Sequence, residues 1–171
     1  MSTLSAAAAM VLAALPMEAE PWRIVNDGVM GGRSQSAVIE TDDGLRFAGE
    51  LSLENNGGFA STRRPIAGGF PGAGAIRLRV RGDGRRYQLR LRQDRAWDGV
   101  AWRHEFDTTG EWQTLTLAFD DFEPVFRGRD VRGAGPVIAD DIRQLGFMLA
   151  DKQAGPFRLD IAAIEPVGPG A

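Results

Sequence analysis

The chain has 171 residues, of which 43% are hydrophobic and 25% charged, and its formal net charge is −3. These values predict one globular domain and exclude a disordered, fibrous or membrane-spanning chain. The absence of cysteine and the single histidine, His104, exclude disulfides, thiol catalysis and multi-histidine zinc sites. The negative net charge argues against a nucleic-acid-binding protein, although every basic residue except Lys152 is arginine.

The first apolar run covers residues 6–15 and is too short to cross a bilayer as a helix. One interpretation is the hydrophobic part of a secretory signal with cleavage near Ala19, but no basic residue precedes Arg23. The alternatives are a short Ala-rich helix or an unstructured extension. We therefore expect an extension or signal over residues 1–21, a β-domain over residues 22–166 and a tail over residues 167–171.

From Trp22 onward, apolar residues alternate with period two, which is typical of strands with one buried face. The predicted strands cover residues 47–53, 59–63, 75–81, 86–92, 102–106, 112–119, 145–149 and 157–161, and residues 33–39 also look like a strand. Clusters of Gly, Pro, Asn and Asp between them are typical of turns. Parallel strands need long, usually helical, crossovers, and none is evident here. We therefore predict an all-β, mainly antiparallel sandwich or jelly roll.

Arginine alternates with apolar residues in two successive predicted strands, 75–81 and 86–92. The outward positions are Arg77, Arg79 and Arg81 in the first strand and Gln88, Arg90 and Arg92 in the second. We predict that the two strands form a hairpin around Gly82-Asp83-Gly84, so that these side chains share one face. Such a face either keeps the sheet soluble or presents guanidinium groups to acidic or polar groups of a partner.

The sequence offers no convincing catalytic or metal-binding constellation. His104 alternates with Trp102 and Phe106, which predicts a packed histidine rather than a general base, and no G-x-S-x-G motif supplies a nucleophile. The adjacent carboxylates at residues 42–43, 120–121 and 140–141 are expected in turns, because neighbouring side chains point in different directions. We predict no enzyme activity, no metal and no cofactor, and leave open a calcium ion held by a loop.

The runs WRIVNDGVMGGRS from Trp22 and FAGELSLENNGGFAS from Phe47 are followed by RVRGDGRRY from Arg79, Trp112 with FDDFEPVFRGR from Phe119, and DKQAGPFRLDI from Asp151. Together these segments resemble the complex I intermediate-associated protein 30 (CIA30) family. The resemblance covers about residues 22–165. It implies a galactose-binding-like jelly roll without catalytic machinery, and a role in assembling respiratory NADH:ubiquinone oxidoreductase.

The resemblance and the residues together give the functional expectation. We expect a non-enzymatic protein-binding domain, an assembly or chaperone-like factor whose partners include respiratory complex subunits. The alternative is a carbohydrate-binding module with Trp97 or Trp102 as a stacking platform. The location is expected to be cytoplasmic, or periplasmic if residues 1–19 are a signal. The candidate binding residues are Asn26, Asp27, Asn55, Asn56, Arg77, Arg79, Arg90, Arg92 and Trp97.

Overall fold

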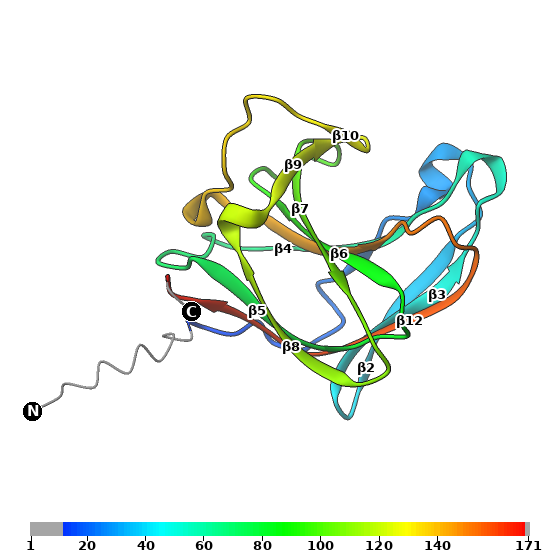
Figure 1. Cartoon of the computed structure of the whole chain (residues 1–171), viewed down its shortest axis with the longest axis horizontal. Helices are drawn as coiled ribbons and strands as arrows, with labels where there is room; N and C mark the ends of the chain where they lie inside the picture. The colour runs from blue at the N-terminus through cyan, green and yellow to red at the C-terminus, as the bar shows by residue number, and fades with distance from the viewer. Residues whose placement is uncertain (1–11, 170–171) are drawn as a thin grey trace, which may run out of the picture.

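Two antiparallel β-sheets lie face to face in the computed structural model, which describes residues 12–169 (Figure 1). The upper sheet in Figure 1 has seven strands, in the order β1 (Arg23–Ile24), β4 (Ala60–Pro65), β11 (Gln144–Leu149), β6 (Arg86–Arg92), β7 (Ala101–Asp107), β9 (Glu123–Phe126) and β10 (Arg129–Asp130). The lower sheet has five strands, in the order β2 (Gln35–Thr41), β3 (Gly44–Leu51), β12 (Gly155–Val167), β5 (Ala75–Arg81) and β8 (Trp112–Ala118). The predicted all-β antiparallel sandwich is confirmed.

Four single-turn 3-10 helices lie in the connections between strands: η1 (Asp27–Met30), η2 (Glu54–Asn56), η3 (Phe119–Asp121) and η4 (Ala139–Asp141). The carboxylate pairs at residues 120–121 and 140–141 belong to η3 and η4, and the pair at residues 42–43 forms the turn between β2 and β3. Their expected place in turns is therefore confirmed. The short strands β1, β9 and β10 were not predicted, because two to four residues are too few for a visible alternation.

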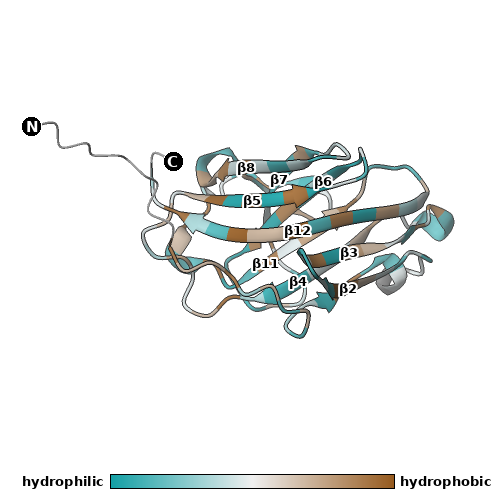
Figure 2. Ribbon diagram, turned by 90° about the horizontal axis from the view of Figure 1, so that it is seen from below, coloured by the Kyte–Doolittle hydropathy of each residue, from teal (hydrophilic) through white to brown (hydrophobic). Residues whose placement is uncertain are grey.

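The core lies between the two sheets and is built from the inward residues of each strand. Phe47, Leu78 and Leu159 from the lower sheet meet Leu89 and Phe147 from the upper sheet, and all five side chains are fully buried. Hydrophobic and hydrophilic residues alternate along β5 and β12 (Figure 2), as expected for strands with one buried and one exposed face.

The predicted hairpin of strands 75–81 and 86–92 is wrong. β5 pairs with β12 and β8 in the lower sheet, whereas β6 pairs with β11 and β7 in the upper sheet. The segment between them is a corner that carries the chain from one sheet to the other. Asp83 holds this corner by accepting hydrogen bonds from the Tyr87 hydroxyl (3.0 Å) and the Arg158 amide (2.8 Å). The arginines of β5 and β6 therefore lie on opposite outer faces of the sandwich.

Residues 12–19 lie against the sandwich. The amides of Leu12 and Leu15 donate hydrogen bonds of 3.0 Å to the carbonyls of Pro166 and Ile164, at the part of β12 that lies beyond its pairing with β3. Leu15, Met17 and Ala19 pack on the core. Part of the expected extension is thus attached to the domain, while residues 1–11, which include residues 6–11 of the apolar run, lie outside the described residues.

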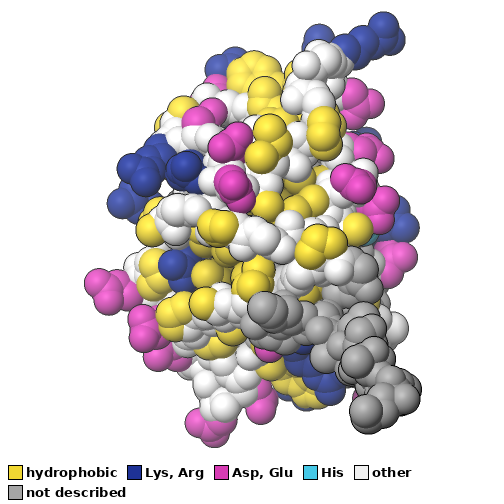
Figure 3. Space-filling view, turned by 90° about the vertical axis from the view of Figure 1, so that its left-hand side faces the viewer, with side chains coloured by type: hydrophobic (Ala, Val, Ile, Leu, Met, Phe, Trp, Pro, Cys, Tyr) yellow, Lys and Arg dark blue, Asp and Glu magenta, His cyan; other side chains and the backbone are white. Residues whose placement is uncertain are grey.

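The side of the molecule that faces left in Figure 1 carries hydrophobic, acidic and basic side chains in mixed order (Figure 3). Single-sign charge therefore does not dominate the visible part of that side. Within residues 12–169, no helix has the length and hydrophobicity needed to cross a membrane.

Candidate functional site

Four arginines gather on the outer face of the seven-stranded sheet, and we call them the arginine cluster: Arg63 on β4, Arg90 and Arg92 on β6, and Arg103 on β7. Their neighbours along each strand point into the core, which directs the arginine side chains outward. The register places Arg63 opposite Gly146, Gly146 opposite Arg90, and Arg90 opposite Arg103. Three of the four arginines therefore form one row across four adjacent strands.

Few hydrogen bonds satisfy the guanidinium groups of the cluster. Arg63 donates to the Trp97 carbonyl (2.7 Å), Arg90 to the Gln88 side-chain oxygen (2.8 Å) and Arg92 to the Gly99 carbonyl (2.9 Å). Among the described residues, Nη1 of Arg63 and Nε of Arg90 are buried and have no hydrogen-bond partner. The cluster therefore holds two donors without partners, which an external acceptor reaches when the arginine side chains turn outward.

Burial and mutual repulsion destabilise the charged forms of Arg63 and Arg90. Burial, and then the positive charges of Arg92, Arg103 and Arg63, lower the pKa of Arg90 to about 10. Burial and the charge of Arg92 likewise lower the pKa of Arg63 to about 10, although Asp98 and Asp94 partly compensate. At neutral pH all these groups remain protonated, so the outer face holds a concentration of positive charge.

On the five-stranded sheet, in contrast to the arginine cluster, Arg46, Arg77 and Arg81 have close carboxylate partners that neutralise their charge. Arg77 pairs with Glu165 at 3.1 Å. Asp160, whose side chain is only 2% exposed, pairs with Arg46 at 2.7 Å and with Arg81 at 3.1 Å. Burial opposes ionisation of Asp160, but the hydrogen bonds from Arg46 and Arg81 outweigh it, and the pKa of Asp160 lies below its ordinary value.

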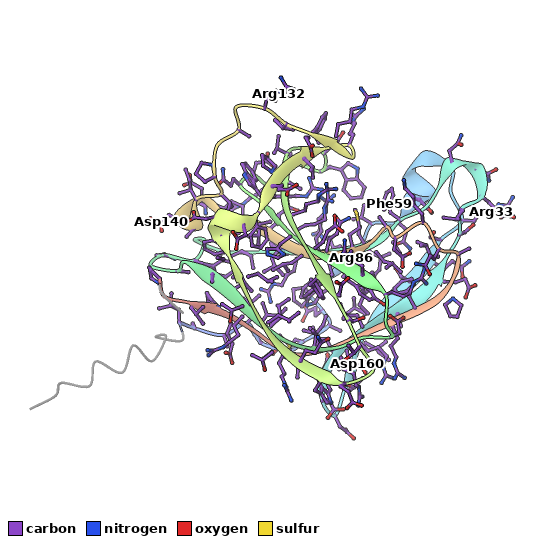
Figure 4. All side chains as sticks on the ribbon, in the orientation of Figure 1. Arg33, Phe59, Arg86, Arg132, Asp140 and Asp160 are labelled. Carbon is purple, nitrogen blue, oxygen red and sulfur yellow. The ribbon has the colours of Figure 1, made fainter. Side chains whose placement is uncertain are left out.

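The structure separates the arginines that the sequence grouped together. Arg77 and Arg79 lie on the outer face of the five-stranded sheet, where Arg79 donates to the Thr114 hydroxyl (3.1 Å) and its guanidinium lies 5.8 Å from the ring centre of Trp112. Arg90 and Arg92 lie on the other outer face. Figure 4 shows the two layers, with Arg86 on the upper sheet and Asp160 on the lower one.

Trp97 stands beside the arginine cluster on the loop between β6 and β7. Its side chain is 59% exposed, and the Arg63 guanidinium lies 4.9 Å from its ring centre. This arrangement is a cation–π contact at the edge of the cluster. The prediction of Trp102 as a stacking platform is wrong, because this side chain is only 5% exposed and its indole N–H donates a hydrogen bond to the Gly135 carbonyl (3.0 Å).

Asp27 connects the two loops that contain η1 and η2. It is fully buried and accepts hydrogen bonds from the Ser34 amide and hydroxyl (2.9 and 2.6 Å) and from the Gly58 amide (2.7 Å). Burial opposes its ionisation, but these hydrogen bonds outweigh it and the pKa of Asp27 lies below its ordinary value. A Cβ at Gly32 or Gly57 would lie within 2.4 or 2.5 Å of this carboxylate, which explains both glycines.

The three predicted asparagines have different positions. The side-chain oxygen of Asn26 accepts from the Ser36 hydroxyl (2.9 Å) and the Ser61 amide (3.1 Å), so it joins loop to sheet as Asp27 does. Asn55 and Asn56 are exposed and have φ angles of 57° and 60°, a conformation that asparagine tolerates in tight turns. Asn55 and Asn56 precede Ala60, at one end of β4. Arg92 lies opposite Gln144, which in turn lies opposite Pro65 at the other end of β4.

The structure supplies no side-chain arrangement typical of metal binding in the part of the chain that it describes, since no three His, Asp or Glu side chains gather there. His104 points inward, as expected, with its ring edge-on to Phe122 at 5.3 Å and Nδ1 2.7 Å from the Glu105 carbonyl oxygen. An open hollow of about 340 Å³ beside β7 is lined by Arg86, Arg103 and Glu105, among others.

Sequence reasoning missed two members of the arginine cluster. Arg63 and Arg103 belong to strands that were predicted, but nothing local shows that β4 and β7 flank β11 and β6. Alternation does place Arg103 on the face opposite Trp102, so its outward direction was detectable. The position of Arg103 directly opposite Arg90 was not detectable from this pattern.

Comparison with solved structures shows the fold. The family 11 carbohydrate-binding module of the cellulase Lic26A-Cel5E of Clostridium thermocellum superposes with a TM-score of 0.65 at 14% identity, over 92% of this chain and 96% of that one. The module from the same organism in complex with a β-1,3-1,4-mixed-linked tetrasaccharide gives 0.63 at 17% identity, over 91% and 94%. The chain therefore has the galactose-binding-like jelly-roll fold of these modules.

Comparison with sequences shows the family. Residues 13–161 match the model "Complex I intermediate-associated protein 30 (CIA30)". The mitochondrial protein of that name from Mus musculus is 27% identical over 165 residues, and a probable one from Caenorhabditis elegans is 28% identical over 138 residues. These matches cover 83% and 78% of this chain but only 50% and 40% of the relatives. The chain belongs to the complex I intermediate-associated protein 30 family.

Proposed function

We propose that this chain is a non-enzymatic protein-binding domain that helps to assemble a respiratory complex of the NADH:ubiquinone oxidoreductase type. In this proposal the outer face of the seven-stranded sheet contacts the partner, and the arginine cluster lies at the centre of that contact. The names of the relatives support the assembly role. The observation that carries the binding face is the gathering of four arginines of which, within residues 12–169, only Arg103 has an ion pair, a long one of 3.9 Å to Asp130. On the opposite face, Asp160 and Glu165 lie 2.7–3.1 Å from their arginines.

The energetics favour a binding role for this cluster over a solubilising one. Arginines that only solubilise a sheet extend into water, where they do not repel one another strongly. Here burial and neighbouring positive charges lower the pKa of Arg90, which means that the fold tolerates an unfavourable arrangement of charge. A partner that brings acceptors to the cluster would relieve this cost.

The proposal is tested by affinity purification from membranes solubilised with a mild detergent, followed by quantitative mass spectrometry. We expect subunits of the respiratory complex to be enriched with the unchanged protein and depleted several-fold with the double variant Arg63→Gln/Arg90→Gln. The matched control is Arg77→Gln/Arg79→Gln, which removes two charges from the opposite face and should retain the subunits. Failure of the unchanged protein to enrich respiratory subunits would contradict the assembly role.

We place the protein in the cytoplasm, where it would meet complex subunits before they are assembled. Residues 12–19 pack on the domain in the described fold, so cleavage near Ala19 would remove part of that packing. Fractionation with protease protection tests this location. Recovery of a shortened protein outside the inner membrane would favour export instead.

The alternative function is carbohydrate binding, which the exposed Trp97 supports by offering an aromatic face beside hydrogen-bond donors. A glycan array separates the two functions. Saccharide binding that is lost in Trp97→Ala would favour the carbohydrate-binding module, whereas an array without signal would leave the protein-binding domain.

A further inference from the structure

The arrangement of the arginine cluster across the sheet defines a particular position for a ligand. In the row described above, Arg63 and Arg90 flank Gly146, so the two arginine strands lie on either side of β11, about 10 Å apart at the usual strand spacing. Gly146 places no side chain between the two arginines, and the stem of Arg63 lies close against its backbone. A Cβ there would lie 2.4 Å from the Thr62 carbonyl oxygen and 2.9 Å from Cβ of Arg63. We call this place the Gly146 seat.

Two of the five buried side-chain donors that lack partners within residues 12–169 belong to the arginines that border the seat; the others belong to Trp22, Arg64 and Arg81. Nη1 of Arg63 and Nε of Arg90 are buried without a hydrogen-bond partner in the described structure. Buried N–H groups of this kind are rare, because leaving a donor unsatisfied costs free energy. Arg92 is also near, since its positive charge is among those that disfavour ionisation of both Arg63 and Arg90. The seat therefore combines positive charge with free, planar donors.

Carboxylates around the cluster limit the size of the anion that fits. Asp94 and Asp98 lie close enough to favour the charged forms of Arg63 and Arg92. Glu123 is directly opposite Arg103 in the register, and Asp130 lies 3.9 Å from that arginine. An extended polyanion such as a nucleic acid would meet these negative charges, whereas a carboxylate side chain would contact only the seat.

The geometry points to a carboxylate-binding site: the Gly146 seat takes aspartate or glutamate side chains from an acidic segment of the protein partner. Arginine binds carboxylates through parallel N–H···O bonds, which would satisfy Nη1 of Arg63 and Nε of Arg90. Trp97 forms one wall of the site through its contact with Arg63. This inference rests on the proposed protein-binding function and names the chemistry that the partner must offer.

Fluorescence anisotropy with a labelled hexaglutamate peptide tests the inference on the full chain. We expect binding at low ionic strength that weakens as salt is added, and no binding of a labelled hexaglutamine peptide. In Arg63→Gln/Arg90→Gln the dissociation constant should rise by roughly tenfold or more, because two buried charge-assisted contacts are lost. Arg77→Gln/Arg79→Gln changes net charge equally and should bind as the unchanged protein does.

A second variant and a second anion make the result decisive. Arg92→Gln alters one member of the cluster and should weaken hexaglutamate binding while both bordering arginines remain. Inorganic phosphate that displaces hexaglutamate would support a shared oxyanion seat. Phosphate binding without hexaglutamate binding, or equal affinity in the cluster and control variants, would overturn the inference.

Failure here is distinguishable from failure of the proposed function. If respiratory subunits are captured equally by the unchanged protein and by Arg63→Gln/Arg90→Gln, and hexaglutamate does not bind, the acidic segment is refuted while the assembly role stands. If hexaglutamate binds as expected but no respiratory subunit is enriched, the seat stands and the assembly role is refuted.

Discussion

Replacing Arg90 by methionine should make the folded protein more stable. Arg90 is one of the two most strongly perturbed members of the arginine cluster, since burial and three neighbouring arginines lower its pKa to about 10. Methionine keeps an unbranched apolar side chain that fills similar space but removes the charge. The folded state then no longer bears the cost of a buried, repelled guanidinium group.

The size of the effect follows from the pKa. A shift of this size corresponds to about 3 kcal/mol of unfavourable interaction for the charged form, at about 1.4 kcal/mol per pKa unit. Loss of the hydrogen bond from Arg90 to Gln88 costs about 1 kcal/mol in return. The free energy of unfolding should therefore rise by about 2 kcal/mol, which for a chain of this length raises Tm by about 4–8 °C.

Urea and thermal unfolding at neutral pH, followed by circular dichroism, measure this change. The gain should shrink at high salt, because part of it is repulsion between arginines. Arg79→Met on the opposite face is the control, and there we expect no measurable gain. A lower or unchanged free energy of unfolding for Arg90→Met would refute the view that the cluster holds unfavourable charge in the absence of a ligand.

Three further outcomes are expected. Asp27→Ala should lower the free energy of unfolding by about 3 kcal/mol, because several loop donors lose their buried acceptor; an unchanged urea midpoint would contradict this. Deleting residues 1–19 should lower Tm in a thermal-shift assay, since Leu15 packs on the core, and an equal Tm would argue against that packing. The folded-state pKa of Asp160 lies below its unfolded value, so its contribution is present above about pH 4 and is lost as pH falls through the folded-state pKa. Acid titration of stability should therefore be flatter in Asp160→Asn, and identical profiles would contradict the ion-pair assignment.

Local pattern was sufficient to predict the longer strands of the sandwich, but not β1, β9 and β10. Alternation of apolar and polar residues reports which residues face the core, so Leu78, Leu89 and Phe47 were recognisable as buried positions. Turn-forming residues marked the connections. The segments of family resemblance led to the jelly roll, which the solved structures of similar fold confirm.

Pairing between strands was not predictable in the same way. Two consecutive strands joined by Gly82-Asp83-Gly84 have the pattern of a hairpin, yet the chain crosses between sheets at this point. The contacts that decide this come from distant residues, because Asp151 binds Arg85 through two hydrogen bonds of 2.9 and 2.8 Å and Asp83 binds the Arg158 amide. A short turn sequence carries no information about such partners.

The arginine cluster was half predicted for the same reason. Arg90 and Arg92 were selected because they share one strand face, which is a local property. Arg63 joined them because β11, from a distant part of the chain, pairs with both β4 and β6, and Arg103 joined them through the pairing of β6 with β7. Asp27, in contrast, proved to be a buried loop acceptor, and only the three-dimensional structure separates that role from ligand binding.

The central claim is that the outer face of the seven-stranded sheet is the binding face and that its arginines contact the carboxylates of a partner. Two-dimensional NMR of the arginine side-chain N–H groups tests it most directly, by titrating hexaglutamate into ¹⁵N-labelled protein. We predict that the signals of Arg63, Arg90 and Arg92 shift progressively while those of Arg77 and Arg79 stay in place. Shifts confined to Arg77 and Arg79, or equal small shifts of all arginines, would contradict the claim.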